Sequence, residues 1–263
     1  MSGPAITVFD DLAALTGAAA ASVRRAAADA RAAGRRFCVA LAGGSTPRGL
    51  YRLLAEPPPA GDQAPDVDWT HADLFFGDER TVPPDHPDSN FGMARDALFS
   101  RAPIPPANVH RIQGEAADLD AVARAYETLL RQRAGEPDPT LAPALDLAIL
   151  GMGADGHTAS LFPGTTALDE GTRLCVPVDV AKLNTRRLTL TYPVFLRARQ
   201  VLFLIAGADK AAPLRAVVEG PDRPRELPSQ VIVRGGRSVS ILCDRAAAGA
   251  LGGIANSKGE SES

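Results

Sequence analysis

The sequence predicts an α/β protein: one domain with a mainly parallel central sheet and helices on both of its faces. Short β-branched and apolar runs alternate with longer Ala- and Leu-rich amphipathic stretches, which is typical of parallel strands joined by helices. Neither an internal repeat nor a break in composition divides the chain. Its 263 residues are enough to bury about three-quarters of the surface that the unfolded chain exposes.

Seven runs are predicted to be strands because each is short, rich in apolar residues and bounded by turn residues. They are Ala5–Phe9, Arg36–Ala42, Trp69–Gly77, Leu145–Leu150, Arg187–Thr191, Val201–Ala206 and Val239–Cys243. The three cysteines, Cys38, Cys175 and Cys243, lie far apart and each in an apolar run. We therefore expect buried, reduced thiols on strands.

Capping residues and turn glycines delimit the predicted helices. They are a helix from a cap at Asp10 or Asp11 to Gly34, one over Pro47–Ala55, one from a cap at Asp118 to Gly135, and one from about Asp209 to Glu219. Pro- and Gly-rich residues 56–66 are predicted to form a surface loop. The domain is expected to cover residues 1–246, and the small, polar residues 247–263 to be a disordered tail.

Composition excludes several classes of protein. The chain has 28 Lys and Arg against 31 Asp and Glu, a net charge of −3, which argues against a nucleic-acid partner. Hydrophobic residues at 45% and charged residues at 22% are ordinary for a globular protein and argue against wholesale disorder. No apolar run approaches the roughly eighteen residues of a membrane span, and the first residues do not resemble a signal peptide. We expect a cytoplasmic protein without a membrane partner.

The first loop with unusual chemistry is Gly43-Gly44-Ser45-Thr46-Pro47, between a strand and a helix. Two glycines let the backbone approach an anion, and the helix N-terminus with two hydroxyls supplies donors. This combination predicts a phosphate site, although a plain turn with a Ser or Thr cap would have the same sequence. The GxxxxGK[ST] pattern of nucleoside triphosphate sites is absent.

The second loop follows the strand that ends at Gly77. Asp78, Glu79 and Arg80 place two acids and a guanidinium at the sheet edge, where the arginine could bind a phosphate or carboxylate and an aspartate could orient or transfer a proton. A salt-bridged structural loop is the alternative. The acids and histidine of segment 85–88 (DHPD) are not favoured as metal ligands, because turn prolines interrupt the segment.

The third loop contains a literal GxGxxG at Gly151, Gly153 and Gly156. A dinucleotide site would require a long helix next, but the segment is interrupted at Pro163-Gly164, so this interpretation is not favoured. An imidazole on a glycine-rich turn beside an acid is instead a candidate general base, which selects His157 and Asp155.

Lysine is rare, and only three of the 28 basic residues are lysines. Lys210 lies at a strand-to-helix turn, where an ammonium could meet an anion. Lys182 and Arg187 precede or begin a predicted strand. For all three, an ordinary surface cation is the alternative.

Taken together, these segments resemble the 6-phosphogluconolactonases, within the glucosamine-6-phosphate isomerase/6-phosphogluconolactonase superfamily. The segments are LAGGSTPRGLY, FFGDERTVPPDHPDSNFGMARDALF, LDLAILGMGADGHTASLFPG and IAGADKAAPLRAV, in that order between about Val39 and Val217. The resemblance implies a Rossmann-like fold of the NagB type. It also implies a carboxylic ester hydrolase that converts 6-phospho-D-glucono-1,5-lactone to 6-phosphogluconate in the oxidative pentose phosphate pathway.

The resemblance also implies roles for individual residues, with neither a metal nor an organic cofactor. His157 would be the general base that activates water, with Asp155 beside it. The phosphate would bind to Gly44, Ser45 and Thr46 together with Arg187 and Lys210, while Asp78 and Arg80 would line the sugar or the phosphate end. The partner would be a small sugar-phosphate lactone, and the protein a monomer or small homo-oligomer. Lys182 is followed by Leu183-Asn184 where the family usually has two prolines, so its role stays open.

Two other functions share these features. An amino-sugar phosphate deaminase would use further acid/base groups, and a carboxylate a few residues beyond His157 would support it; the sequence there reads TASLFPG. A non-catalytic sugar-phosphate sensor would use the same phosphate site, but no helix-turn-helix or basic patch accompanies it.

Overall fold

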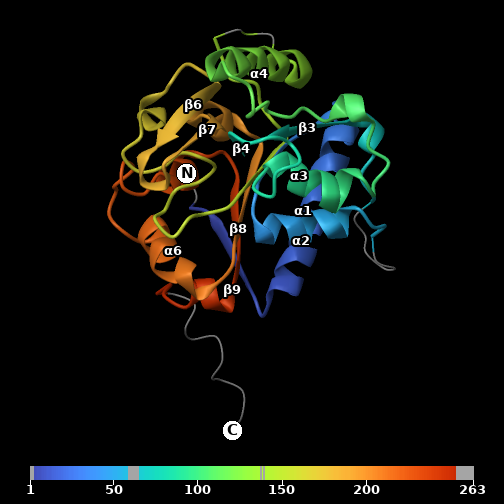
Figure 1. Cartoon of the computed structure of the whole chain (residues 1–263). Helices are drawn as coiled ribbons and strands as arrows, with labels where there is room; N and C mark the ends of the chain where they lie inside the picture. Colours follow the sequence, from blue (N-terminus) through green and yellow to red (C-terminus); the bar gives the residue numbers. More distant parts are fainter. Residues whose placement is uncertain (1–2, 59–64, 137, 139, 253–263) are drawn as a thin grey trace.

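A computed structural model describes residues 3–58, 65–136, 138 and 140–252 (Figure 1). Six strands form one parallel sheet in the order β1-β9-β8-β5-β2-β3. They are β1 (Ala5–Phe9), β2 (Phe37–Leu41), β3 (Ala72–Phe76), β5 (Leu147–Leu150), β8 (Gln200–Ile205) and β9 (Val239–Asp244). The predicted α/β class with a mainly parallel central sheet is therefore confirmed.

A second, antiparallel sheet lies beside the first and was not predicted. Its strands are β4 (Asp78–Arg80), β7 (Thr185–Leu190) and β6 (Cys175–Val180), in the order β4-β7-β6. Gly77 joins the two sheets: its N–H donates to the Leu41 carbonyl (2.9 Å), and its own carbonyl accepts from the Leu190 N–H (2.8 Å). The segment 78–80, expected as a loop, is thus a short strand whose pairing partner lies more than a hundred residues away in the sequence.

The helices are α1 (Leu12–Ala32), α2 (Ser45–Leu54), α3 (Asn90–Ala94), α4 (Leu119–Ala134), α5 (Tyr192–Arg197), α6 (Ala211–Val218), α7 (Ser229–Gly235) and α8 (Arg245–Ala248). Asp11 caps α1 by accepting from the Ala14 N–H (2.8 Å). The predicted cap of α4 at Asp118 and its end at Gly135 are confirmed. Helix α2 begins at Ser45, two residues before the predicted Pro47, so both hydroxyl residues lie in its first turn.

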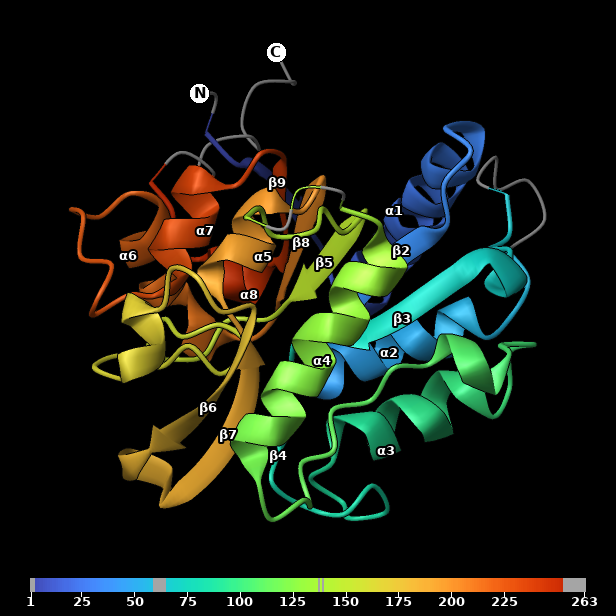
Figure 2. The ribbon, with the colours of Figure 1, turned by 90° about the horizontal axis from the view of Figure 1, so that it is seen from above.

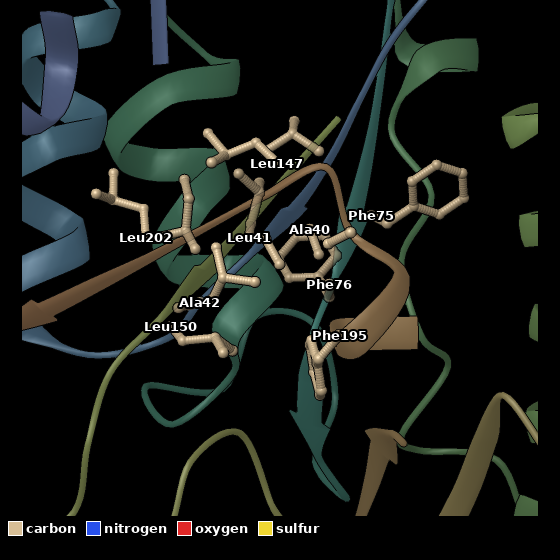
Figure 3. Packing of buried hydrophobic residues seen from close by; sticks show 14 of the residues in the cluster. Ala40, Leu41, Ala42, Phe75, Phe76, Leu147, Leu150, Phe195 and Leu202 are labelled. Carbon is tan, nitrogen blue, oxygen red and sulfur yellow. The ribbon is translucent and has the colours of Figure 1, made fainter. Parts of the chain in front are cut away.

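Helices cover both faces of the parallel sheet (Figure 2). Successive side chains of a strand point to opposite faces, and β3 illustrates both sides. Phe75 packs edge-on against Tyr126 of α4, whereas Phe76 packs against Phe91 and Phe99 beyond the other face. Figure 3 shows the apolar residues that fill the sheet interior, among them Leu41, Leu147 and Leu202.

Other predictions from the sequence concern the three cysteines, the C-terminal tail and the loop 56–66. Cys38, Cys175 and Cys243 are free and buried, as expected. The predicted tail starts at residue 247, whereas Ala247, Ala248 and Leu251 are buried. The rest of that tail, 253–263, and part of the predicted loop, 59–64, lie outside the described residues. Within the described residues, no helix is long and apolar enough to cross a membrane.

Candidate active site

A cavity of about 260 Å³ lies at the carboxyl ends of β2, β3, β5 and β8. Its wall is made by residues that follow these four neighbouring strands, including Gly43, Asp78, His157 and Lys210. After β2 the chain adds β3 on one side, and it later adds β5 on the other. Ligands of open α/β sheets bind at such a switch point, and here the sequence-distant candidate residues meet there.

A tight turn after β5 presents His157 to this cavity. The Gly153 N–H donates to the His157 carbonyl (2.8 Å), and Gly156 has a φ of +75°, which favours glycine. The His157 ring lies so close to Gly153 that a side chain there would overlap it. The backbone therefore fixes where the imidazole points.

Asp155 sets the chemistry of that imidazole. Its carboxylate lies 2.5 Å from Nδ1 of His157, so Nδ1 carries the proton and Nε2 is left as the basic atom. Among the described residues, none forms a hydrogen bond with Nε2. On the hairpin between β6 and β7, Lys182 extends its ammonium to the same carboxylate.

The ring of Phe162 stacks on His157, with centroids 3.9 Å apart. Burial lowers the pKa of His157 to about 4; Asp78 opposes this shift, and the cations of Arg187, Lys210 and Arg80 add to it. The imidazole is therefore neutral at physiological pH, the form that a general base requires.

Arg80 and Arg187 face each other directly across the β4–β7 pair, and both line the cavity. Like charges opposite one another destabilise a sheet unless an anion lies between them. Nε is buried without a hydrogen-bond partner in both side chains. Burial, followed by the charge of Arg80, lowers the pKa of Arg187. This pair therefore has the properties of an anion site.

Asp78 is buried between these groups. Its carboxylate accepts hydrogen bonds from Ser160 Oγ (2.6 Å) and Asn90 Nδ2 (3.2 Å), and one oxygen lies 4.0 Å from Arg187. Asn90 also packs on Gly43, where any side chain would collide with it. Asn90 thus connects the first and second loops, a role that sequence reasoning missed.

Glu79 holds the second loop in place, although it is not among the residues that line the cavity. It is only 2% exposed. Its carboxylate accepts from the N–H groups of Arg80, Asn90 and Phe91, each at 2.8 Å, and from Ser89 Oγ at 3.2 Å. Burial raises its pKa, although these hydrogen bonds oppose the shift.

Replacing Glu79 with glutamine should lower the free energy of unfolding by about 1–3 kcal/mol, because the amide NH₂ cannot accept hydrogen bonds and buried donors lose their partner. Urea denaturation measures this change. The matched control is Glu226→Gln, since the Glu226 side chain is 71% exposed. Equal unfolding midpoints for both variants would contradict a structural role for Glu79.

The structure places the remaining predicted residues as follows. Lys210 lines the cavity just before α6 and lies 2.9 Å from the Asp209 carboxylate. Gly44, Ser45 and Thr46 directly follow the cavity residue Gly43 at the start of α2, but they are not among the residues that line the cavity. Among the described residues, no group of three or more His, Cys, Asp or Glu could hold a metal ion.

The glycine-rich turn 151–156 offers backbone N–H groups, which could stabilise a developing oxyanion. In the structure the Gly156 N–H donates to the Gly153 carbonyl (3.0 Å), and the Gly153 N–H is also bonded within the turn. These two donors close the turn and are not free for a ligand.

The parallel sheet and the cavity at its switch point define an α/β protein whose cleft is lined by an imidazole and three cationic side chains, those of Arg80, Arg187 and Lys210. A model of the family described as "Glucosamine-6-phosphate isomerases/6-phosphogluconolactonase" matches residues 10–241. The chain therefore belongs to this family.

Individual relatives agree with that assignment. A 6-phosphogluconolactonase of Synechocystis is 42% identical over 79% of this chain and 82% of its own length. The human 6-phosphogluconolactonase is 39% identical over 94% of this chain and 95% of its own length. Among solved structures, 6-phosphogluconolactonase from Trypanosoma cruzi has a TM-score of 0.80 at 29% identity, covering 96% of this chain and 98% of that one.

Proposed function

We propose that the protein hydrolyses 6-phospho-D-glucono-1,5-lactone to 6-phosphogluconate, with His157 as the general base. The observation that carries this proposal is the position of His157 in one cavity with Arg80, Arg187 and Lys210. The neutral imidazole fits a substrate whose reacting centre is uncharged. The cations beside it fit a substrate that carries an anionic group elsewhere. The family membership and the names of the relatives support the same substrate class.

In the proposed reaction, the oxygen of a water molecule attacks the lactone carbonyl carbon, C1. At the same time, Nε2 of His157 takes a proton from that water molecule. Asp155 stabilises the imidazolium that forms, since it already holds Nδ1. The bond between C1 and the ring oxygen then breaks, and the ring oxygen takes the proton from the His157 imidazolium, which returns the imidazole to its neutral form. The product is the open-chain acid.

The phosphate end is assigned to Arg187, Lys210 and the first turn of α2, Gly44 to Thr46. Arg187 presents a buried guanidinium, and a helix N-terminus with free N–H groups suits a phosphate. We assign Asp78 and Arg80 to the boundary between sugar and phosphate, since both line the cavity close to Arg187. Binding energy from the phosphate then positions C1 against the base.

A lactone-hydrolysis assay corrected for the spontaneous rate tests the activity. The protein should accelerate ring opening of 6-phospho-D-glucono-1,5-lactone far above the uncatalysed rate. Release of ammonia from glucosamine 6-phosphate without lactone turnover would instead identify a deaminase and overturn the proposal.

The pH dependence follows from the state of His157. The neutral imidazole is the active form and its pKa is lowered to about 4, so kcat/KM should rise with pH through that value. It should then stay level between about pH 6 and pH 8. Initial rates across this range, corrected for spontaneous hydrolysis, measure the profile. An inflection at the ordinary histidine value of 6.5 would contradict this role for the buried ring.

A further inference from the structure

A second concave site lies away from the cavity just described, between α2 and the segment that continues α3. It is a groove of about 400 Å³, and the residues that line it include none that line the first cavity. Helices α2 and α3 lie side by side in both views of the ribbon (Figures 1 and 2). The π-helical turn Arg95–Phe99 continues α3 along this groove.

Four arginines line the groove: Arg48 and Arg52 from α2, Arg95 from the π-helical turn, and Arg101 just beyond it. Two acids, Asp85 and Asp96, also line it, so the local formal charge is positive in a chain whose net charge is −3. We call this set of four arginines and its cavity the arginine groove.

Few of these charges are compensated by the protein. Arg95 pairs with its neighbour Asp96, with Nε and Oδ1 3.0 Å apart. Arg48, Arg52 and Arg101 form no ion pair with any residue in the described ranges. Arg48 and Arg52 are also one helical turn apart on α2, and like charges at this spacing destabilise a helix. An anion bound in the groove would offset this repulsion.

The chemistry of the groove indicates the kind of anion. Each guanidinium presents a planar fork that can bind one phosphate through two hydrogen bonds. Arginines on two different elements around one groove suit a ligand with two adjacent phosphates. A volume of about 400 Å³ is in the range of small-molecule sites. Met93 and Ala97 add apolar surface to the same wall.

We propose that the arginine groove binds a small molecule that carries a diphosphate group, at a site separate from the candidate active site. The shared chemistry of inorganic pyrophosphate and a nucleoside diphosphate fits the groove equally well, whereas a single phosphate would engage only part of it.

Isothermal titration calorimetry on the full chain with pyrophosphate, ADP and AMP tests this proposal. Pyrophosphate and ADP should bind, and AMP should bind about tenfold or more weakly, because it offers one phosphate. Equal affinity for pyrophosphate and ADP would identify the inorganic diphosphate as sufficient, and tighter ADP binding would indicate that the nucleoside contributes; both support the site. AMP binding as tight as ADP binding, or no binding of any of the three, would overturn the proposal.

Variants locate the bound anion. The double variant Arg52→Ala/Arg101→Ala should weaken pyrophosphate binding about tenfold or more and leave the rate of lactone hydrolysis unchanged. Lys210→Ala, in the other cavity, should not weaken pyrophosphate binding. Arg124→Ala is the matched control, because Arg124 is an exposed arginine on α4. A loss of binding in Lys210→Ala, or an equal loss in Arg124→Ala, would overturn the proposal.

Discussion

Replacing His157 with alanine should lower kcat/KM for hydrolysis of 6-phospho-D-glucono-1,5-lactone by about 10²-fold or more, while 6-phosphogluconate still binds. Nε2 of His157 is the basic atom that faces the cavity, and the cations beside it lie on other elements. The substitution therefore removes the imidazole and leaves these cations in place. Stopped assays for activity and calorimetry with 6-phosphogluconate measure the two effects separately.

His71→Ala is the matched control for this experiment. The His71 side chain is 69% exposed and pairs with Asp68, far from the carboxyl edge of the sheet. Its activity should equal that of the unmodified protein. Wild-type activity in His157→Ala would remove the imidazole from the mechanism.

Replacing Lys210 with alanine should raise KM for the phosphorylated lactone by about 10²-fold, because truncating one partner of a buried charge pair costs about 2–5 kcal/mol. The Lys210 side chain is only 23% exposed and lines the cavity, so its ammonium is well placed to be desolvated by a bound phosphate. Unphosphorylated gluconolactone offers no phosphate, and its hydrolysis should change by no more than about twofold.

Asp209→Asn distinguishes the effect of losing the Lys210–Asp209 ion pair from the effect of losing the Lys210 ammonium. It removes the carboxylate that lies 2.9 Å from the ammonium but keeps the ammonium itself. The phosphorylated lactone should then react with nearly unchanged KM. Equal losses on both lactones in Lys210→Ala would show that Lys210 does not contact the phosphate.

The parallel sheet could be predicted because its strands carry their own signal. β2, β5, β8 and β9 are short apolar runs that end in turn residues, and the predicted runs overlap all four. The family resemblance implied that His157 and Lys210 share one site, and both line the same cavity in the structure. Residues at the carboxyl ends of neighbouring parallel strands converge at one edge.

The antiparallel sheet could not be predicted in the same way. β4 has three residues, all charged, and it is a strand only because β7 pairs with it from far along the chain. The opposition of Arg80 and Arg187 depends on that pairing. Local patterns contain no information about a long-range register, so the direct opposition of these two arginines appeared only in the structure.

Contacts made by side chains from distant loops were missed for a similar reason. Asn90 reaches Asp78, and Lys182 reaches Asp155 from a hairpin whose shape the sequence left open. The motif DSN, residues 88–90, was visible as part of the family resemblance. Only the structure showed that Glu79 holds this motif in place and that the motif supports Asp78.

The most direct test of the central claim, that one cleft holds both the base and the phosphate, is a crystal structure with bound 6-phosphogluconate. We expect the phosphate against Lys210, Arg187 and the first turn of α2, with the C1 carboxylate within hydrogen-bond distance of Nε2 of His157. A phosphate seated on His157, or a product molecule bound outside this cavity, would contradict the claim.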